Sequence, residues 1–353
     1  DYQNLDQNID RELAAYLYSG VTAVESAGDA VDQILKHRAA MASGEKLGAE
    51  LFVVGPMFTA AGGRGTEYAQ YVPENIRQQM EQQMVRLPKS PDEARMQVAE
   101  LKSLGVNGIK AIREAGALDP ALLHAVAEAA RAAGLPIVVH TGTPQDVASA
   151  LDAQVDGIEP GSMGESIPEA LFVRMKQIGV TFDPTLAEID AVQDFSEGKA
   201  DPLDRTLVQQ VVPRRMLDET RNQLASMAAH LEHPLRLDLA KQNLAAAYRA
   251  GVTLATGTDS GNPPMFHGPG IHREVQLWVE AGVPPAAALQ AATYNAARLL
   301  RADGRIGLIR RGYEASLLLV DGNPLQDISA TERISSVFLK GERVNRQKLF
   351  DQK

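Results

Sequence analysis

Three residues of different chemistry stand at the ends of apolar segments of this sequence. Lys110 lies in the segment GIKAI, His140 ends the segment IVVH, and Asp259 lies in TGTDSG. A lysine at the end of an apolar strand is costly to bury as an ammonium unless it is paired or neutralised. Such an amine could form a Schiff base, or it could be carbamylated and act as a carboxylate that bridges metal ions. A surface lysine whose stem lies along apolar neighbours is the ordinary alternative.

His140 and Asp259 complete the set of groups that a hydrolytic site needs. An imidazole beside Lys110 on the next strand is a candidate metal ligand, although a core histidine after an apolar strand is also common. A carboxylate at the end of a buried strand can bind a metal and accept the proton of an attacking water. The alternative is that Asp259 has only a structural role, because Asp-Ser-Gly is a common turn sequence. His140 and Asp259 are therefore candidate metal ligands and Asp259 is the candidate catalytic residue, while Lys110 stays open between an imine-forming amine and a carbamylated metal bridge.

Four further side chains are candidates for contact with a substrate. Arg64 and Tyr68 lie in the segment GGRGTEY, Arg113 follows Lys110 closely, and His267 lies in HGPGIHRE. Arginine binds carboxylates in a bidentate manner, so these residues could hold a substrate carboxylate or carbonyl group. Each of them also has a purely structural interpretation.

The elements that must position these residues follow an alternating pattern. Helical segments precede short, apolar and β-branched segments, and glycine commonly separates the two, as expected at a helix end. Strands without clean alternation are typical of parallel sheets that are buried on both faces. The expected strands lie at 20–28, 50–58, 105–112, 135–142, 155–162, 179–186 and 251–261.

The ends of these strands favour a barrel over an open sheet. Lys110, His140, Glu159, Asp183 and Asp259 lie at or near the carboxyl ends of five different strands. In a barrel those ends meet at one face, where barrel enzymes build their active sites. In an open sheet they would be spread along an edge. We therefore predict an α/β fold, a TIM (β/α)8 barrel whose first strand lies upstream of residue 1.

The predicted domain organisation divides the chain near residue 304. Residues 1–304 form the barrel, with a helical insertion at about 187–235 that is a candidate lid. Residues 305–353 contain segments that alternate or run apolar, at 315–322 and 334–345, which indicate antiparallel strands. We expect this tail to be the C-terminal part of a small composite β-sandwich.

Composition narrows the classes of partner and chemistry. The chain of 353 residues has 35 basic and 45 acidic side chains, for a net charge of −10, which disfavours nucleic acid and anionic membranes as partners. The absence of cysteine excludes thiol nucleophiles and thiolate zinc sites. A small-molecule substrate is the expected partner. Localisation stays unknown, and a homo-oligomer is left open.

The ordered segments of this chain resemble the amidohydrolase superfamily. The segments GIKAI, IVVHTGT, DGIEPGS, TFDPTL and LATGTDSG, with the VDGNPL and VFLKGERV tail, are similar to the imidazolonepropionase- and prolidase-like metal-dependent hydrolases. The resemblance implies a TIM barrel with a β-sandwich. It also implies hydrolysis of an amide-type bond by a metal-bound hydroxide, with one or two Zn²⁺ ions. It places the carbamylated lysine at Lys110, a histidine ligand at His140 and the aspartate at Asp259.

Two departures from the family pattern bear on activity. The His-x-His pair that ends the first strand in the family is absent from this chain. The family has Glu-His-Gly at its sixth strand, where this chain has Glu159-Pro160-Gly161, and proline cannot bind a metal. We therefore expect weak or no metal binding and little hydrolysis from these 353 residues alone. Two other functions stay open, which are a metal-free lyase that uses Lys110 as a Schiff-base amine and a non-catalytic scaffold.

Overall fold

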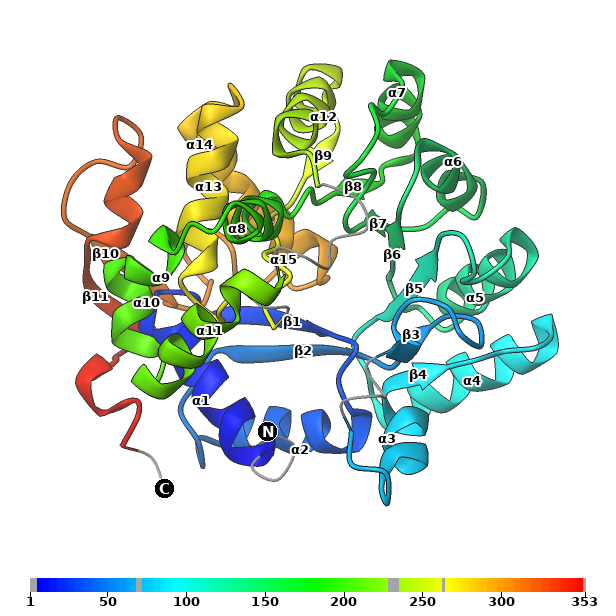
Figure 1. Cartoon of the computed structure of the whole chain (residues 1–353), viewed down its shortest axis with the longest axis horizontal. Coiled ribbons are helices and arrows are strands. Elements are labelled where there is room, and N and C mark those ends of the chain that lie inside the picture. The colour runs from blue at the N-terminus through cyan, green and yellow to red at the C-terminus, as the bar shows by residue number, and fades with distance from the viewer. Residues whose placement is uncertain (1–4, 68–71, 228–234, 262–263, 352–353) are drawn as a thin grey trace.

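The computed structural model describes residues 5–67, 72–227, 235–261 and 264–351 (Figure 1). Its centre is a parallel sheet with the strand order β4-β3-β5-β6-β7-β8-β9. The strands are β3 (Met57–Phe58), β4 (Val85–Arg86), β5 (Ile109–Arg113), β6 (Ile137–Thr141), β7 (Gly157–Ile158), β8 (Thr181–Phe182) and β9 (Thr253–Leu254). Two more strands, β1 (Ala23–Ala27) and β2 (Glu50–Gly55), form a parallel pair, and β2 leads into β3.

Helices cover the outer side of these strands, as the alternating sequence predicts (Figure 1). They are α2 (Val31–Ser43), α4 (Pro91–Leu104), α5 (Pro120–Ala132), α6 (Pro144–Asp152), α7 (Glu169–Ile178), α12 (Leu237–Ala250) and α13 (Gly270–Glu280). Aliphatic side chains such as Val53, Ile109, Val139 and Ile158 are buried between the layers. The predicted α/β barrel fold is confirmed.

Local sequence signals explain where these helices begin. The Ser90 side chain accepts a hydrogen bond from the Glu93 amide at 3.2 Å, with Pro91 in the first turn of α4. Thr143 and Asp146 form a reciprocal capping box at the start of α6. Each cap satisfies backbone N–H groups that lack a partner within the helix, so the turn from strand to helix is well defined.

The regular ladder has a break between β1 and β9. Among the described residues, β1 pairs only with β2 and β9 pairs only with β8. The end of α1 (Leu5–Tyr18) crosses this break, where His272 Nε2 donates to the Ser19 carbonyl at 2.9 Å. A Cβ on Gly268 would lie 2.4 Å from the Ala15 carbonyl oxygen, which shows how closely the two segments approach. We call the residues Ala15, Ser19, Gly268 and His272 the clasp.

Helices follow β8 in the region predicted as an insertion. They are α8 (Leu186–Ser196), α9 (Asp201–Asp204), α10 (Thr206–Val211) and α11 (Arg214–Met227). Phe195, Leu203, Val208 and Val211 form a small apolar cluster that also includes Ala15 of α1. Residues 228–234 of the predicted insertion lie outside the described residues.

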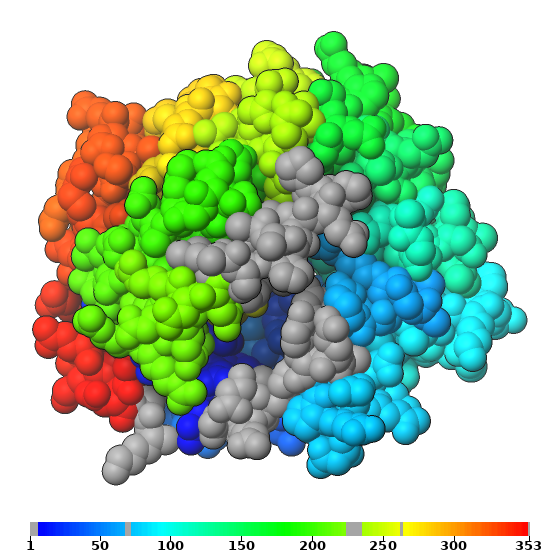
Figure 2. All heavy atoms as spheres, in the orientation of Figure 1, coloured from blue at the N-terminus to red at the C-terminus, as the bar shows by residue number. Residues whose placement is uncertain are grey.

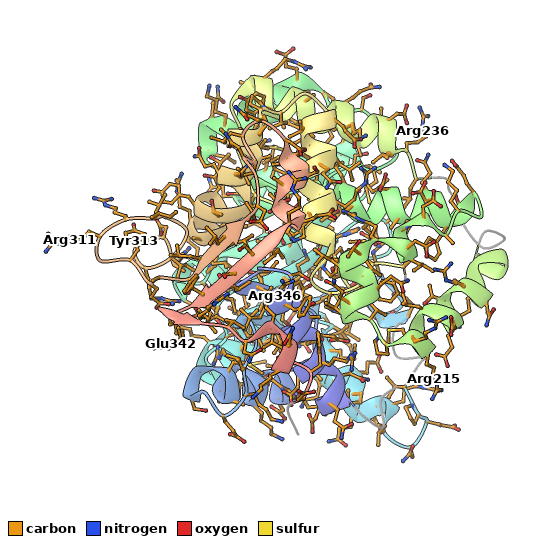
Figure 3. All side chains as sticks on the ribbon, turned by 90° about the vertical axis from the view of Figure 1, so that its left-hand side faces the viewer. Arg215, Arg236, Arg311, Tyr313, Glu342 and Arg346 are labelled. Atoms are coloured by element: carbon orange, nitrogen blue, oxygen red, sulfur yellow. The ribbon has the colours of Figure 1, made fainter. Side chains whose placement is uncertain are left out.

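The C-terminal segment forms an antiparallel sheet. It contains β10 (Leu317–Val320), β11 (Ile334–Leu339) and β12 (Glu342–Arg343), with Glu342 at one end of the sheet (Figure 3). The guanidinium of Arg346 lies 4.1 Å from the centre of the Tyr18 ring, and its Nε donates to the Tyr18 carbonyl at 2.8 Å. This sheet is therefore held against the end of α1.

Three elements differ from the sequence-based expectation. The long polar segment after β3 contains the helix α3 (Arg77–Met84) and the short strand β4, neither of which the sequence predicted. The predicted helix at 284–300 is divided into α14 (Pro285–Gln290), a π-helical turn (Ala291–Asn295) and α15 (Ala296–Leu299).

No helix in the described parts of the chain combines the length and apolar character needed to cross a membrane.

Candidate active site

A cavity of about 1320 Å³ lies at the carboxyl ends of the strands and continues past the break between β1 and β9. Its lining includes β1, the segment after β9, and β10 of the C-terminal sheet. Figure 2 shows a hollow on one face of the molecule, with blue N-terminal residues visible at depth. Large concave pockets at this end of a barrel are where ligands are expected to bind.

Lys110 and Glu159 form an ion pair inside this cavity. Lys110 is 9% exposed, and its Nζ donates to the Glu159 carbonyl at 3.0 Å and to Glu159 Oε2 at 3.3 Å. β5 and β6 carry the lysine to this position, because they pair in register from Ile109 to Arg113. Lys110 is thus held as a hydrogen-bond donor between the ends of β5 and β7, as a paired ammonium.

His140 lies on the neighbouring strand and is paired with Glu114. Its Nε2 is 3.3 Å from Glu114 Oε2. Burial lowers the pKa of His140 despite this carboxylate, and the positive charges of Arg64 and Lys110 act in the same direction as burial. His140 is therefore a neutral imidazole at neutral pH. Burial acts to raise the pKa of Glu114, but the hydrogen bond with His140 and the positive charge of Arg64 help to hold that pKa low.

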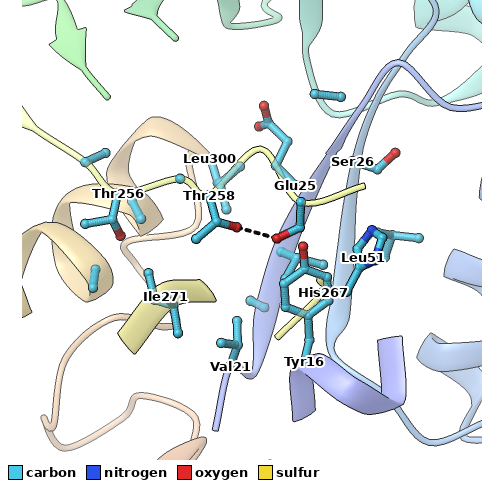
Figure 4. Close-up of a pocket in the computed structure, with 18 of the residues that line it drawn as sticks. Tyr16, Val21, Glu25, Ser26, Leu51, Thr256, Thr258, His267, Ile271 and Leu300 are labelled. Atoms are coloured by element: carbon cyan, nitrogen blue, oxygen red, sulfur yellow. Dashed lines mark hydrogen bonds between the residues drawn. The ribbon is translucent and has the colours of Figure 1, made fainter. Parts of the chain in front are cut away.

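Asp259 follows β9 in a turn that faces the cavity. Its φ of 46° is in the left-handed region, which aspartate tolerates better than most residues. The side chains of Thr258 and Ser260 on either side form a 2.8 Å hydrogen bond (Figure 4). Asp259 itself is exposed, so water in the cavity can reach its carboxylate.

Asp183 connects the ends of β8 and β9. The Thr185 amide donates to Asp183 Oδ1 at 3.1 Å, and the Gly257 amide also donates to this carboxylate. A Cβ on Gly257 would lie only 2.1 Å from Asp183 Oδ2, so this contact requires glycine. Burial raises the pKa of Asp183 well above its usual value, and the nearby carboxylates of Glu159 and Glu274 add to the shift.

Glu25 is the residue of this group that sequence reasoning missed. It lies on β1, is partly buried and lines the cavity (Figure 4). Burial raises the pKa of Glu25 to about 8; the negative charge of Glu159 acts in the same direction and Lys110 opposes it. The segment VESAG could have indicated a functional role for this residue, because a glutamate within an expected strand is unusual.

A second group of polar side chains lies beside the clasp. His267 Nε2 is 3.8 Å from Glu12 Oε2, and the Tyr16 ring meets the His267 ring edge-on with 5.5 Å between centroids. Burial lowers the pKa of His267 to about 4 and raises that of Glu12 to about 7. His267 is therefore neutral at pH 7, and it lines the cavity as a hydrogen-bonding group without charge.

The remaining substrate candidates lie in different surroundings. Arg64 lines the cavity. Arg113 points toward α6, where its Nε donates to Ser149 Oγ at 3.2 Å and its NH1 lies 3.2 Å from Asp146 Oδ1. Tyr68 lies outside the described residues. The structure thus brings Lys110, His140, Asp259, Arg64 and His267 to one cavity and directs Arg113 into the helix layer.

The fit of a metal ion can be tested on the donors themselves. Within the ranges that the structure describes, no three imidazole or carboxylate side chains converge as a metal-ligand group. Lys110 is bound to Glu159, His140 is bound to Glu114, and Pro160 offers no side-chain donor. The donors as arranged do not fit a metal centre, and we derive no reaction step through one.

Comparison with known proteins supports the family resemblance. A family model described as "Amidohydrolase family" matches residues 3–344. Ochratoxinase of Aspergillus niger is 37% identical over 95 residues, which are 26% of this chain and 18% of that protein. The match thus spans less than a fifth of this curated relative.

Solved structures are similar over nearly the whole chain. A Xaa-Pro dipeptidase with bound methionine in its active site has a TM-score of 0.72 and 25% identity, covering 94% of this chain and 77% of that one. Molinate hydrolase has a TM-score of 0.76 and 20% identity, covering 98% of this chain and 77% of that one, which shows the shared fold. Amidohydrolases are hydrolases that act on C–N bonds, and they usually bind divalent metals. This chain belongs to the amidohydrolase family.

Proposed function

We propose that this chain hydrolyses an amide-type C–N bond of a small molecule bound in the cavity. The observation that carries the proposal is that Lys110 of β5, His140 of β6 and Asp259 after β9 all line one cavity. The membership of the chain in a family of hydrolases supports the same reaction class.

Asp259 is the proposed general base. Its carboxylate is open to the cavity, so it can accept a proton from the water that attacks the substrate carbonyl. Arg64 and the neutral His267 are proposed to contact a substrate carbonyl, because both line the cavity and can donate hydrogen bonds. Arg113 is better suited to positioning β5 against α6, since its guanidinium is bound to Ser149 and Asp146.

The family resemblance implies one or two Zn²⁺ ions bridged by a carbamylated lysine at Lys110. Lys110 must lose a proton and leave Glu159 before its amine can be carbamylated. We therefore propose that Zn²⁺ binds this chain weakly, which a calorimetric titration with ZnCl₂ tests. Tight stoichiometric binding would contradict this part of the proposal.

Hydrolysis is tested with a panel of N-acyl amino acids, dipeptides and anilides, with and without added divalent metal. We expect release of amine from at least one amide, and a loss of about 100-fold or more in kcat for Asp259→Asn. Asp152→Asn is the matched control, because this carboxylate is exposed at the end of α6 and pairs with Arg174. The proposal fails if no amide is cleaved under either condition, or if Asp259→Asn retains the wild-type rate.

A further inference from the structure

The lining of the cavity contains more acidic than basic side chains. Among the described residues that line it, acidic side chains outnumber basic ones seven to two, and the two basic residues are Lys110 and Arg64. Partly enclosed surfaces of one sign focus the electrostatic potential and raise the local concentration of ligands of the opposite sign. At a pH where these acidic side chains are ionised, the cavity favours a cationic ligand over an anionic one.

The partners of these carboxylates separate one of them from the others. Glu159 is bound to Lys110, Asp183 accepts two backbone amides, and Glu314 Oε1 is bound to Arg305 at 2.6 Å. Glu25 has no hydrogen-bond partner among the described residues, although it lines the same cavity as Lys110 and Glu159 and interacts electrostatically with both. A partly buried carboxylate without a partner is costly unless a ligand supplies donors.

A second polar group in the cavity also lacks a partner. Thr185 is 4% exposed and lines the cavity, and within the described ranges its Oγ1 has no hydrogen-bond partner. Its backbone is fixed by the bond of its amide to Asp183. A buried hydroxyl can accept a hydrogen bond, so it is suited to one of the three donors of an ammonium group.

We propose that this cavity selects small molecules that carry a protonated amine, with Glu25 as the carboxylate that receives the ammonium and Thr185 as an additional acceptor. This inference rests on the proposed function for its assignment of the cavity as the substrate site. Glu25 is a specificity-determining residue in this view and takes no part in bond cleavage. The ion pair is formed in a partly enclosed site, where it is screened by salt less than a surface pair.

The test compares two amides that differ only in the charged group, N-acetyl-L-lysine anilide and N-acetyl-L-norleucine anilide. Because burial raises the pKa of Glu25 to about 8, measurements at pH 9 keep this carboxylate ionised while the lysine amine stays protonated. Calorimetry gives Kd for both ligands independently of turnover, and anilide hydrolysis gives kcat/KM. We expect the lysine compound to bind at least tenfold more tightly to the wild-type chain.

Two variants assign the preference to Glu25. Glu25→Gln keeps the shape of the side chain and should reduce the Kd ratio to within about twofold of one, while Glu25→Asp keeps the charge and should retain a preference. Glu128→Gln, which removes the same charge from the outer surface of α5, should leave the wild-type ratio unchanged.

The outcomes separate this inference from the proposed function. Equal binding of the two anilides to the wild-type chain overturns the inference without any variant, and so does a tenfold preference that survives in Glu25→Gln. A preference in Kd without cleavage of either anilide supports amine selection and counts against the proposed hydrolysis of such amides.

Discussion

Glu25 and Glu274 are two carboxylates in low-polarity surroundings that differ in what satisfies them. Glu274 of α13 is fully buried and accepts hydrogen bonds from the amides of Leu186 and Ala187 at 3.1 and 2.6 Å and from Trp278 Nε1 at 2.7 Å. Glu25 faces the cavity and has no such partner among the described residues. Burial raises the pKa of Glu274 to about 7, compared with about 8 for Glu25.

The difference distinguishes a structural carboxylate from one that is available to a ligand. Glu274 satisfies the N-terminus of α8 and so fixes the turn that follows β8, which carries Asp183. Removing it leaves buried donors without acceptors. Removing Glu25 leaves no donor unpaired among the described residues, so we expect the change to affect ligand binding more than stability.

The largest effect on stability is expected for Glu274→Ala. This change leaves three buried N–H groups unpaired, and we expect a loss of about 3–5 kcal/mol in the free energy of unfolding. Glu25→Ala should change the same quantity by less than about 1 kcal/mol. Chemical denaturation of both variants measures the difference, and equal destabilisation would refute the distinction between the two carboxylates.

Asp183 is intermediate between Glu274 and Glu25, because it lines the cavity but also accepts hydrogen bonds from the amides of Thr185 and Gly257. Gly257→Ala places a Cβ against Asp183 Oδ2 and should cost about 1–3 kcal/mol through displacement of the turn after β9. Gly164→Ala is the matched control, since nothing lies within 4 Å of a Cβ at that position. Thermal unfolding of the two variants checks this, and similar midpoints would show that the close approach is not required.

The raised pKa values make stability depend on pH. Glu25 and Glu274 hold protons in the folded chain up to about pH 8 and 7, whereas the unfolded chain releases them near 4.5. The free energy of unfolding should therefore fall as pH rises from 6.5 to 8. His267 and His272 act with the opposite sign only below pH 6.5, because burial lowers their pKa values to about 4.

Glu25→Gln sharpens this pH prediction. The variant should reduce the fall in stability between pH 6.5 and 8 by about 1 kcal/mol, because one of the titrating groups is removed. Urea denaturation at several pH values gives the slope. An unchanged slope would mean that Glu25 is already ionised in the folded chain at pH 6.5.

The smallest change in the free energy of unfolding is expected for a substitution of a solvent-exposed carboxylate. Glu219 pairs with Arg215 one turn away on α11, and both side chains are more than half exposed. Glu219→Gln should change the free energy of unfolding by less than about 0.5 kcal/mol. A larger loss in the denaturation midpoint would indicate that α11 contributes more than a solvated surface.

Much of the fold could be predicted from sequence because each element carries local signals. Glycine after a helix, Ser90 and Thr143 as caps, and runs of β-branched residues all act over a few positions. Strand β4 and helix α3 were missed because their segment is polar and lacks such periodicity. The π-helical turn at Ala291–Asn295 was missed for a similar reason, since its sequence is that of an ordinary helix.

The candidate site could be predicted only in part. Lys110, His140 and Asp259 were found because polar residues at strand ends stand out from their neighbours. The partners of these residues could not be predicted, because the ion pair of Lys110 with Glu159 joins residues that are 49 positions apart in the sequence. Arg113 shows the same limit, because its proximity to Lys110 in sequence says nothing of its bond to Asp146 in space.

The clasp has a consequence for how the cavity opens. In a closed barrel, continuous main-chain pairing sets the distance between every two neighbouring strands, so the interior has a fixed diameter. Between β1 and β9 that distance is set instead by a few local contacts, among them the bond from His272 to Ser19 and the close packing of Gly268 on Ala15. Because Ser19 and His272 also line the cavity, a substitution in the clasp would change the cavity wall without removing any main-chain hydrogen bond between strands.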